Sequence, residues 1–338
     1  MNAFSGNTSV LSLALVTFGL ALPSAPVSST AKQETTDDLG PERMEQVIES
    51  LATKIEDQYI FEELAKEIGA HLRQQLWDGA YEGISLGKLA DRLTRDLRSV
   101  NNDLHLGVRR IIPRDEREVE ISPEESRRRQ IENYRRRNFG FAKVEILDGN
   151  VGYLDLRSFA PAEIAAETAV AAMGFLANTD ALIIDLRNNG GGSPSMVQLL
   201  STYFFEEPTH LNSFELRGQK LIKQFWTLPY APGKKLVDTP LYILTSGRTF
   251  SAAEEFTYNM KNLGRATIVG ETTGGGAHPG GTHDIEGLLS VFIPDGRAIN
   301  PISGTNWEGV GIPAHVKVTQ TQALDRAKTL AREGSTGE

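Results

Sequence analysis

Residues 245–255 read TSGRTFSAAEE, and the rest of the chain can be organised around them. The apolar run 241–244 has the composition of a buried strand, and residues 256–260 follow as the body of a helix. Ser251 therefore stands where a strand turns into a helix, and free backbone N–H groups and the helix dipole favour negative charge there. The stretch predicts either an activated nucleophile or a simple N-cap, because Glu254 would complete a capping box.

A second strand-to-helix junction lies earlier in the chain. The buried-strand pattern 181–185 runs into 186–195, LRNNGGGSPS, and a helical pattern follows. The glycines at 190–192 let the backbone adopt positive φ, approach a ligand closely and aim N–H groups outwards. The chain lacks G-x-x-x-x-G-K-[ST], and no G-x-G-x-x-G stands in a dinucleotide-binding context. The junction therefore predicts either an oxyanion hole or a structural turn.

Two further segments carry histidines. His105 follows the third predicted helix in a loop, two residues after Asp103, which makes it a candidate general base or a surface-loop histidine. Residues 270–281 contain His278 and are too rich in glycine to pack as a regular element. We expect this glycine-rich segment to form a loop beside the active site.

Composition excludes several classes of protein. The 338 residues are 40% hydrophobic and 23% charged, which is typical of a globular chain long enough for two domains. The absence of cysteine excludes disulfides, thiolate metal sites and a cysteine nucleophile. The net charge of −9 argues against a nucleic-acid partner. The histidines are scattered and H-E-x-x-H is absent, so neither a metal nor an organic cofactor is expected.

The N-terminus has the pattern of an export signal. Residues 10–22 form an apolar run of 13, too short to span a bilayer as a helix, and small and Pro-rich residues follow it. We expect a signal peptide over about 1–31, with cleavage after Ser29-Thr30-Ala31, and a periplasmic or extracellular mature protein without a stable membrane span. The alternative is an uncleaved signal that anchors the protein to the membrane.

The remaining chain divides by its patterns. Apolar residues recur every three or four positions from 41 to 100, which predicts helices packed on one another or on the next domain. From 141 onwards, strand, helix and strand patterns alternate, which predicts an α/β domain with a largely parallel sheet. Residues 206–239 show no clear pattern. The predicted segments are the signal peptide (1–31), a linker (32–40), a helical N-terminal domain (41–100), a histidine loop and charged connector (101–140), the α/β domain (141–320), and a C-terminal helix and tail (321–338).

Four motifs occur in a fixed order: DLRNNGGG at 185–192, TSGRTFSAAEE at 245–255, GETTGGGA at 270–277 and WEGVGIP at 307–313. Together they resemble the serine peptidases of the tail-specific, or C-terminal-processing, family. The similarity is strongest to the branch that contains interphotoreceptor retinoid-binding protein modules and the tricorn protease core, and it is strong over 141–318. The resemblance implies a crotonase-like catalytic domain behind the small helical domain. Some 30 residues separate Val108 from Phe141, so we expect no inserted PDZ domain.

The resemblance assigns roles to residues at matching positions. Ser251 becomes the nucleophile, and the oxyanion hole takes the N–H of Ala252 and that of Gly190 or Gly191. In the bacterial processing proteases a lysine in the glycine-rich loop is the base. Here residues 274–277 read GGGA, so a serine–lysine dyad is not expected.

The tricorn-like branch supplies other partners for the serine. Its histidine base corresponds to His105 and its glutamate to Glu308. That glutamate acts through a serine just before the histidine, but this chain has Leu104 there. Glu308 would therefore reach His105 directly or through water, or Asp103 would orient the ring. The alternative bases are His278 and His283.

These observations predict an exported serine endopeptidase that cleaves peptides or unfolded proteins through an acyl-enzyme. Two alternatives stay open at this stage. One is a non-catalytic module that binds a lipid or a retinoid-like ligand on the same fold. The other is a hydrolase of small esters or amides, which the same groups would permit. The sequence leaves the oligomeric state open.

Overall fold

The computed structural model describes residues 39–112, 122–219 and 222–335, which belong to one unit spanning Thr36–Glu338. The predicted signal peptide and all but the last two residues of the predicted linker lie outside these ranges. Within them, no helix combines the length and the hydropathy needed to cross a membrane.

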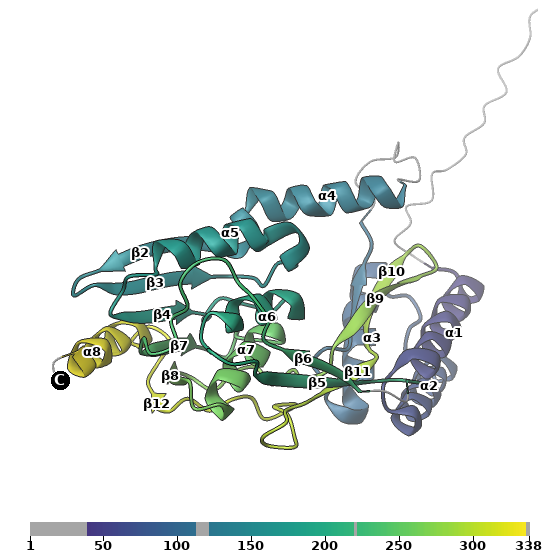
Figure 1. Ribbon diagram of the computed structural model, residues 1–338. Helices are drawn as coiled ribbons and strands as arrows, with labels where there is room; N and C mark the ends of the chain where they lie inside the picture. Colours follow the sequence, from purple (N-terminus) through teal and green to yellow (C-terminus); the bar gives the residue numbers. More distant parts are fainter. Residues whose placement is uncertain (1–38, 113–121, 220–221, 336–338) are drawn as a thin grey trace, which may run out of the picture. The chain divides into compact units, whose positions relative to one another are not determined.

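A six-stranded sheet forms the centre of the α/β region, with strand order β12-β8-β7-β4-β3-β2 (Figure 1). All neighbouring strands from β3 to β12 are parallel, and β2 alone runs antiparallel to its neighbour β3. The largely parallel sheet predicted from the sequence is therefore confirmed. The strands are β2 (Phe141–Leu147), β3 (Val151–Leu156), β4 (Ala181–Asp185), β7 (Leu241–Thr245), β8 (Ala266–Gly270) and β12 (Val316–Lys317).

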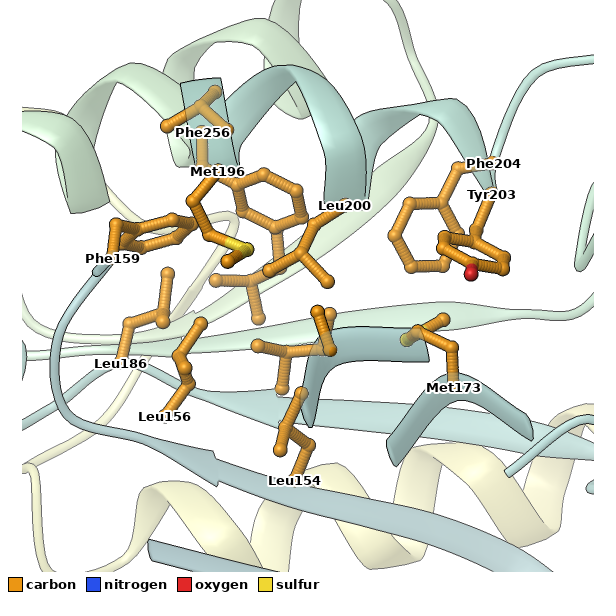
Figure 2. Packing of buried hydrophobic residues seen from close by; sticks show 14 of the residues in the cluster. Leu154, Leu156, Phe159, Met173, Leu186, Met196, Leu200, Tyr203, Phe204 and Phe256 are labelled. Atoms are coloured by element: carbon orange, nitrogen blue, oxygen red, sulfur yellow. The ribbon is translucent and has the colours of Figure 1, made fainter. Parts of the chain in front are cut away.

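Helices cover both faces of this sheet. Successive side chains of a strand point to opposite faces, so Leu182 and Ile184 of β4 pack with the helices α5, α6 and α7, while Ala181 and Ile183 pack with α8. Figure 2 shows the first face, where aromatic and methionine side chains fill the space between sheet and helices. The helices are α5 (Ala162–Phe175), α6 (Pro194–Thr202), α7 (Ala252–Asn262) and α8 (Ala323–Ser335).

Three helices precede the α/β region, as predicted: α1 (Pro41–Gln58), α2 (Glu62–Trp77) and α3 (Leu86–Asn101). Their buried stripes do not form a separate core. They pack together with a three-stranded antiparallel sheet of order β1-β10-β9, whose Val108, Leu289 and Val291 belong to the same buried cluster. Strands from the C-terminal half therefore complete the N-terminal helical layer. The strands are β1 (Gly107–Arg110), β9 (Gly280–Ile285) and β10 (Leu289–Pro294).

A third sheet has the order β11-β5-β6 and uses part of the segment 206–239, for which the sequence predicted no structure. The pattern was missed because the buried positions of β5 include the polar residues Asn212 and Ser213, which hide its alternation. The strands are β5 (His210–Leu216), β6 (Lys223–Trp226) and β11 (Gly296–Ile299).

The charged connector between β1 and β2 contains an Arg-rich helix, α4 (Pro123–Arg136), and the short 3₁₀ turn η1 (Asn138–Gly140). Residues 113–121 of the connector lie outside the described ranges. No PDZ domain is present in the part of the chain that the structure describes, in agreement with the short spacing.

Candidate active site

The turn after β7 holds Ser251 in an unusual conformation. Its φ is 55° and its ψ is −123°, a region that non-glycine residues rarely occupy. Two hydroxyls tie the turn to the end of β4, because Ser246 Oγ donates to Arg187 O at 2.7 Å and Thr249 Oγ1 donates to Leu186 O at 2.8 Å. The strained backbone places Ser251 at the N-terminus of α7, as the sequence predicted.

The glycine turn after β4 lies directly against this serine. Gly191 has a φ of +109°, and a Cβ atom there would be 2.7 Å from Ser251 Cβ. The N–H of Gly191 donates to Asn189 Oδ1 at 2.8 Å and is therefore occupied. Among the described residues, the N–H groups of Gly190 and Ala252 have no hydrogen-bond partner. Of the two glycines that the sequence left open as oxyanion donors, Gly190 is the one whose N–H has no partner within the described ranges.

Glu254 joins the serine turn to the glycine-rich loop. Its carboxylate is fully buried. Oε2 accepts the N–H groups of Ser251 and Gly276, both at 2.9 Å. Oε1 accepts Gly275 N–H at 2.7 Å and the Thr273 hydroxyl at 2.5 Å. The sequence marked Glu254 only as a capping-box partner, and the loop contacts went unpredicted because no local pattern encodes them.

His105 lies between two aromatic rings. Its centroid is 4.6 Å from that of Phe250, the residue before Ser251, and 5.6 Å from that of Phe292 on β10. Both ring nitrogens are buried without a hydrogen-bond partner among the described residues. Burial lowers the pKa of His105 to about 4, although the nearby Asp103 charge opposes the shift. The imidazole is therefore neutral near pH 7 and can accept a proton.

The acids expected to orient His105 contact another histidine. Asp103 Oδ2 lies 2.8 Å from His278 Nδ1 and accepts the Tyr59 hydroxyl at 3.0 Å. Asp103 reaches His105 only through the backbone, where Oδ1 accepts the N–H of His105 at 2.9 Å. Glu308 Oε2 lies 3.6 Å from His278 Nδ1. Neither carboxylate makes a direct hydrogen bond to the His105 ring among the described residues, and both lie nearer to His278.

The surroundings of Glu308 disfavour the charged form of its carboxyl group. Its Oε2 accepts Ala277 N–H at 2.5 Å, but Oε1 is buried without a partner among the described residues. Burial, together with the negative charge of Asp103, raises the pKa of Glu308 to about 7. Donor atoms of Asp103, His278 and Glu308 lie within 4.8 Å of one another, a spacing that a cation would fit. The Asp103–His278 hydrogen bond already occupies two of these donors.

One cavity of about 910 Å³ brings the candidate residues together. Its wall includes Ser251, Ala252 and Gly190 as well as the two histidines His105 and His278. His283, the other alternative base, does not line this cavity. It lies on β9, paired with Val291 of β10. The cavity therefore combines a serine, two N–H groups without a partner among the described residues, and two imidazoles; acyl transfer needs the serine, the N–H groups and one of the imidazoles as base.

Family models match most of the described chain. A model described as "Peptidase family S41" matches residues 150–318, and one described as the "N-terminal domain of Peptidase_S41 in eukaryotic IRBP" matches residues 41–136. The matched ranges contain the four motifs and the D-x-H loop noted in the sequence.

Solved structures share the fold. A protein from Parabacteroides merdae ATCC 43184 is 18% identical, with a TM-score of 0.60 over 87% of this chain and 97% of that one. The tricorn protease is 13% identical, with a TM-score of 0.54, and the match covers 86% of this chain and 37% of the tricorn protease chain. For a protein from Bacteroides fragilis NCTC 9343 the identity is 17% and the TM-score 0.51, and the match covers 58% of each chain. At these identities the likeness concerns the fold alone.

Proposed function

The chain belongs to peptidase family S41, and on this premise we propose that it is an exported serine endopeptidase that hydrolyses peptides or unfolded proteins. The observation that carries the proposal is the position of Ser251. It sits in strained backbone at the N-terminus of α7, inside a cavity that also holds free N–H groups and neutral imidazole. A binding module would not need this combination.

The proposed reaction follows from these groups. A histidine accepts the proton of Ser251 Oγ as the oxygen attacks the carbonyl carbon of the scissile bond. The N–H groups of Gly190 and Ala252 stabilise the negative charge on the carbonyl oxygen. The protonated histidine then donates to the leaving amine, which gives an acyl-enzyme. Water, deprotonated by the same histidine, releases the acid product.

We propose His105 as the base and keep His278 as the alternative. His105 packs on Phe250, next to the nucleophile, and neither ring nitrogen has a partner among the described residues, so the unprotonated one is free to accept a proton. His278 has Nδ1 held by Asp103, which is the relation that orients the base in other serine hydrolases. His283 is the weaker alternative because it lies outside the cavity wall.

Labelling with a fluorophosphonate tests the nucleophile. The folded protein should form an adduct on Ser251, and Ser251→Ala should form none while keeping its unfolding midpoint. The wild-type protein should hydrolyse casein or a quenched fluorescent peptide, and Ser251→Ala should not. Failure of the folded protein both to label and to cleave would refute the enzyme proposal and favour a ligand-binding role.

Histidine variants test the base. His105→Ala should slow labelling about 10²–10⁴-fold, the usual contribution of a general base. His283→Ala is the matched control and should label at nearly the wild-type rate. If His278→Ala abolished labelling and His105→Ala slowed it only slightly, His278 would be the base instead.

Export rests on the sequence of residues 1–31, which lie outside the described ranges. The expected mature N-terminus is near Lys32. Sequencing the N-terminus of protein recovered from the periplasm or the medium checks this, and an intact Met1 in the cytosolic fraction would contradict it.

A further inference from the structure

Glu255 is a buried acid in the wall of the cavity, and the proposed mechanism does not use it. It follows Ser251 by four residues, and its backbone N–H donates to Ser251 O at 2.9 Å in the first turn of α7. Its exposed fraction is 3%, and it lines the cavity together with Ser251 and Ala252. A carboxyl group therefore stands one helical turn behind the candidate nucleophile.

This carboxyl has no cationic partner among the described residues. Its polar neighbour is Asn212 on β5, a residue with no exposed surface. Neither amide atom of Asn212 has a partner of hydrogen-bonding geometry in the described chain. Burial raises the pKa of Glu255 to about 7, and Asn212 opposes the shift only partly. A buried acid with only a neutral amide beside it and no cation is costly, and such groups cluster at functional sites.

The surroundings fit a long cationic side chain. Phe214, Ala298 and Trp307 line the same cavity and form one apolar cluster. Apolar walls suit the methylene stem of lysine or arginine, and the acid suits the charged end.

The other charges of the cavity come from different elements. Arg95 and Arg98 lie on α3 and Arg109 lies on β1. Asp91, also on α3, is the other carboxylate of the described cavity wall, and it is exposed to solvent. Glu255 is therefore the buried acid that a substrate cation would meet on the α7 side.

We propose that Glu255, backed by the fully buried Asn212, forms the polar end of a specificity subsite for a lysine or arginine side chain on the acyl side of the scissile bond. This subsite rests on the proposed peptidase function and names its substrate class. The bound cation would supply the positive charge that the buried Glu255 carboxyl lacks among the described residues.

Matched peptide substrates test the subsite. N-acetylated tripeptide aminomethylcoumarides ending in Arg, Lys, Gln or Leu differ only at the residue concerned. The Arg and Lys substrates should show a kcat/KM at least about tenfold above the others. Glu255→Gln keeps the shape and should remove this preference while changing kcat/KM for the Leu substrate less than threefold. Asp91→Asn, which removes the same charge from the exposed rim, should keep the preference.

A labelling assay separates failure of the subsite from failure of the peptidase function. Benzamidine carries an amidinium group, and benzamide is its neutral counterpart. Benzamidine should protect Ser251 from the fluorophosphonate at a concentration at least about tenfold lower than benzamide in the wild type, but not in Glu255→Gln. Labelling with no difference between the two compounds, or a preference for the Leu substrate, would overturn the subsite and leave the peptidase standing. Absence of both labelling and turnover would overturn the function and the subsite together.

Discussion

Glu254→Gln is the substitution whose effect the structure defines most closely. The Glu254 carboxylate accepts four hydrogen bonds, two on each oxygen, and it connects the backbone of Ser251 to the glycine-rich loop. Glutamine keeps the size of the side chain but offers one oxygen acceptor and one NH₂ donor. Whichever way the amide turns, its nitrogen faces groups that already donate.

The loss of stability in Glu254→Gln is set by the more favourable of the two orientations of the glutamine amide. With the oxygen toward Ser251 and Gly276, the NH₂ group faces Gly275 N–H and the Thr273 hydroxyl. The hydroxyl can rotate to accept, so one backbone N–H stays unpaired. Losing one hydrogen bond to a charged group costs about 1.5–3 kcal/mol. Burial raises the pKa of Glu254, and relief of that desolvation cost offsets part of the loss, so we expect a destabilisation of about 2 kcal/mol.

Loss of this hydrogen bond should let the glycine-rich loop 270–281 move, and the movement should also lower activity. Gly276 packs against the His105 ring, so its movement should slow fluorophosphonate labelling of Ser251 at least about tenfold. Urea unfolding at pH 7 and the labelling rate are the two measurements. Glu167→Gln, an exposed change on α5, is the control and should stay within about 0.5 kcal/mol. Wild-type stability together with a wild-type labelling rate in Glu254→Gln would refute the positioning role.

Three further predictions concern the same site. Gly276→Ala would place a Cβ 2.2 Å from Phe250 Cζ and 2.6 Å from His105 Cε1, so turnover should fall at least about tenfold, and normal turnover would contradict the packing. Because burial lowers the pKa of His105 to about 4, the acid limb of kcat/KM should lie near pH 4. An acid limb near pH 6.5 in the kcat/KM profile would exclude His105 as the base. Keeping His105 neutral in the folded protein contributes about 3 kcal/mol to the free energy of unfolding above pH 6.5, and this contribution should be lost as the pH falls towards 4. Burial and Asp103 raise the pKa of Glu308 to about 7, so the stability from its neutral form is present below pH 4.5 and lost as the pH rises through 7. Glu308→Gln should therefore be more stable than the wild type at pH 8 in urea unfolding, and equal stabilities at pH 8 would contradict this.

Local patterns in the sequence predicted the strand–helix junctions correctly. The run 241–244, the turn at Ser251 and the following helix have the expected order, and so have 181–185 and the glycine turn after it. Burial along a strand and the onset of a helix depend on neighbours in the chain, so periodicity and turn residues encode them. The glycines at 190–192 predicted a turn that could approach a ligand closely, and in the structure Gly191 lies against Ser251.

The sequence did not predict contacts between distant segments. The pairing of Asp103 with His278 joins residues 175 positions apart, and no spacing rule links them. The polar strand residue Asn212 broke the alternation that would have revealed β5. Strands β9 and β10 complete the core of helices that lie far earlier in the chain. Each of these outcomes depends on which surfaces meet when the chain packs.

The amino-acid sequence by itself therefore determined that Ser251 stands at a strand-to-helix turn and that a glycine turn follows another strand, because each feature arises within a few residues. That the two turns meet was decided by the tertiary structure. Only the tertiary structure decided that Glu254 ties this turn to the glycine-rich loop, and that the carboxylates of Asp103 and Glu308 gather at His278. The physical reason is that hydrogen bonds and charge contacts at the site are made across segments that packing alone brings within reach.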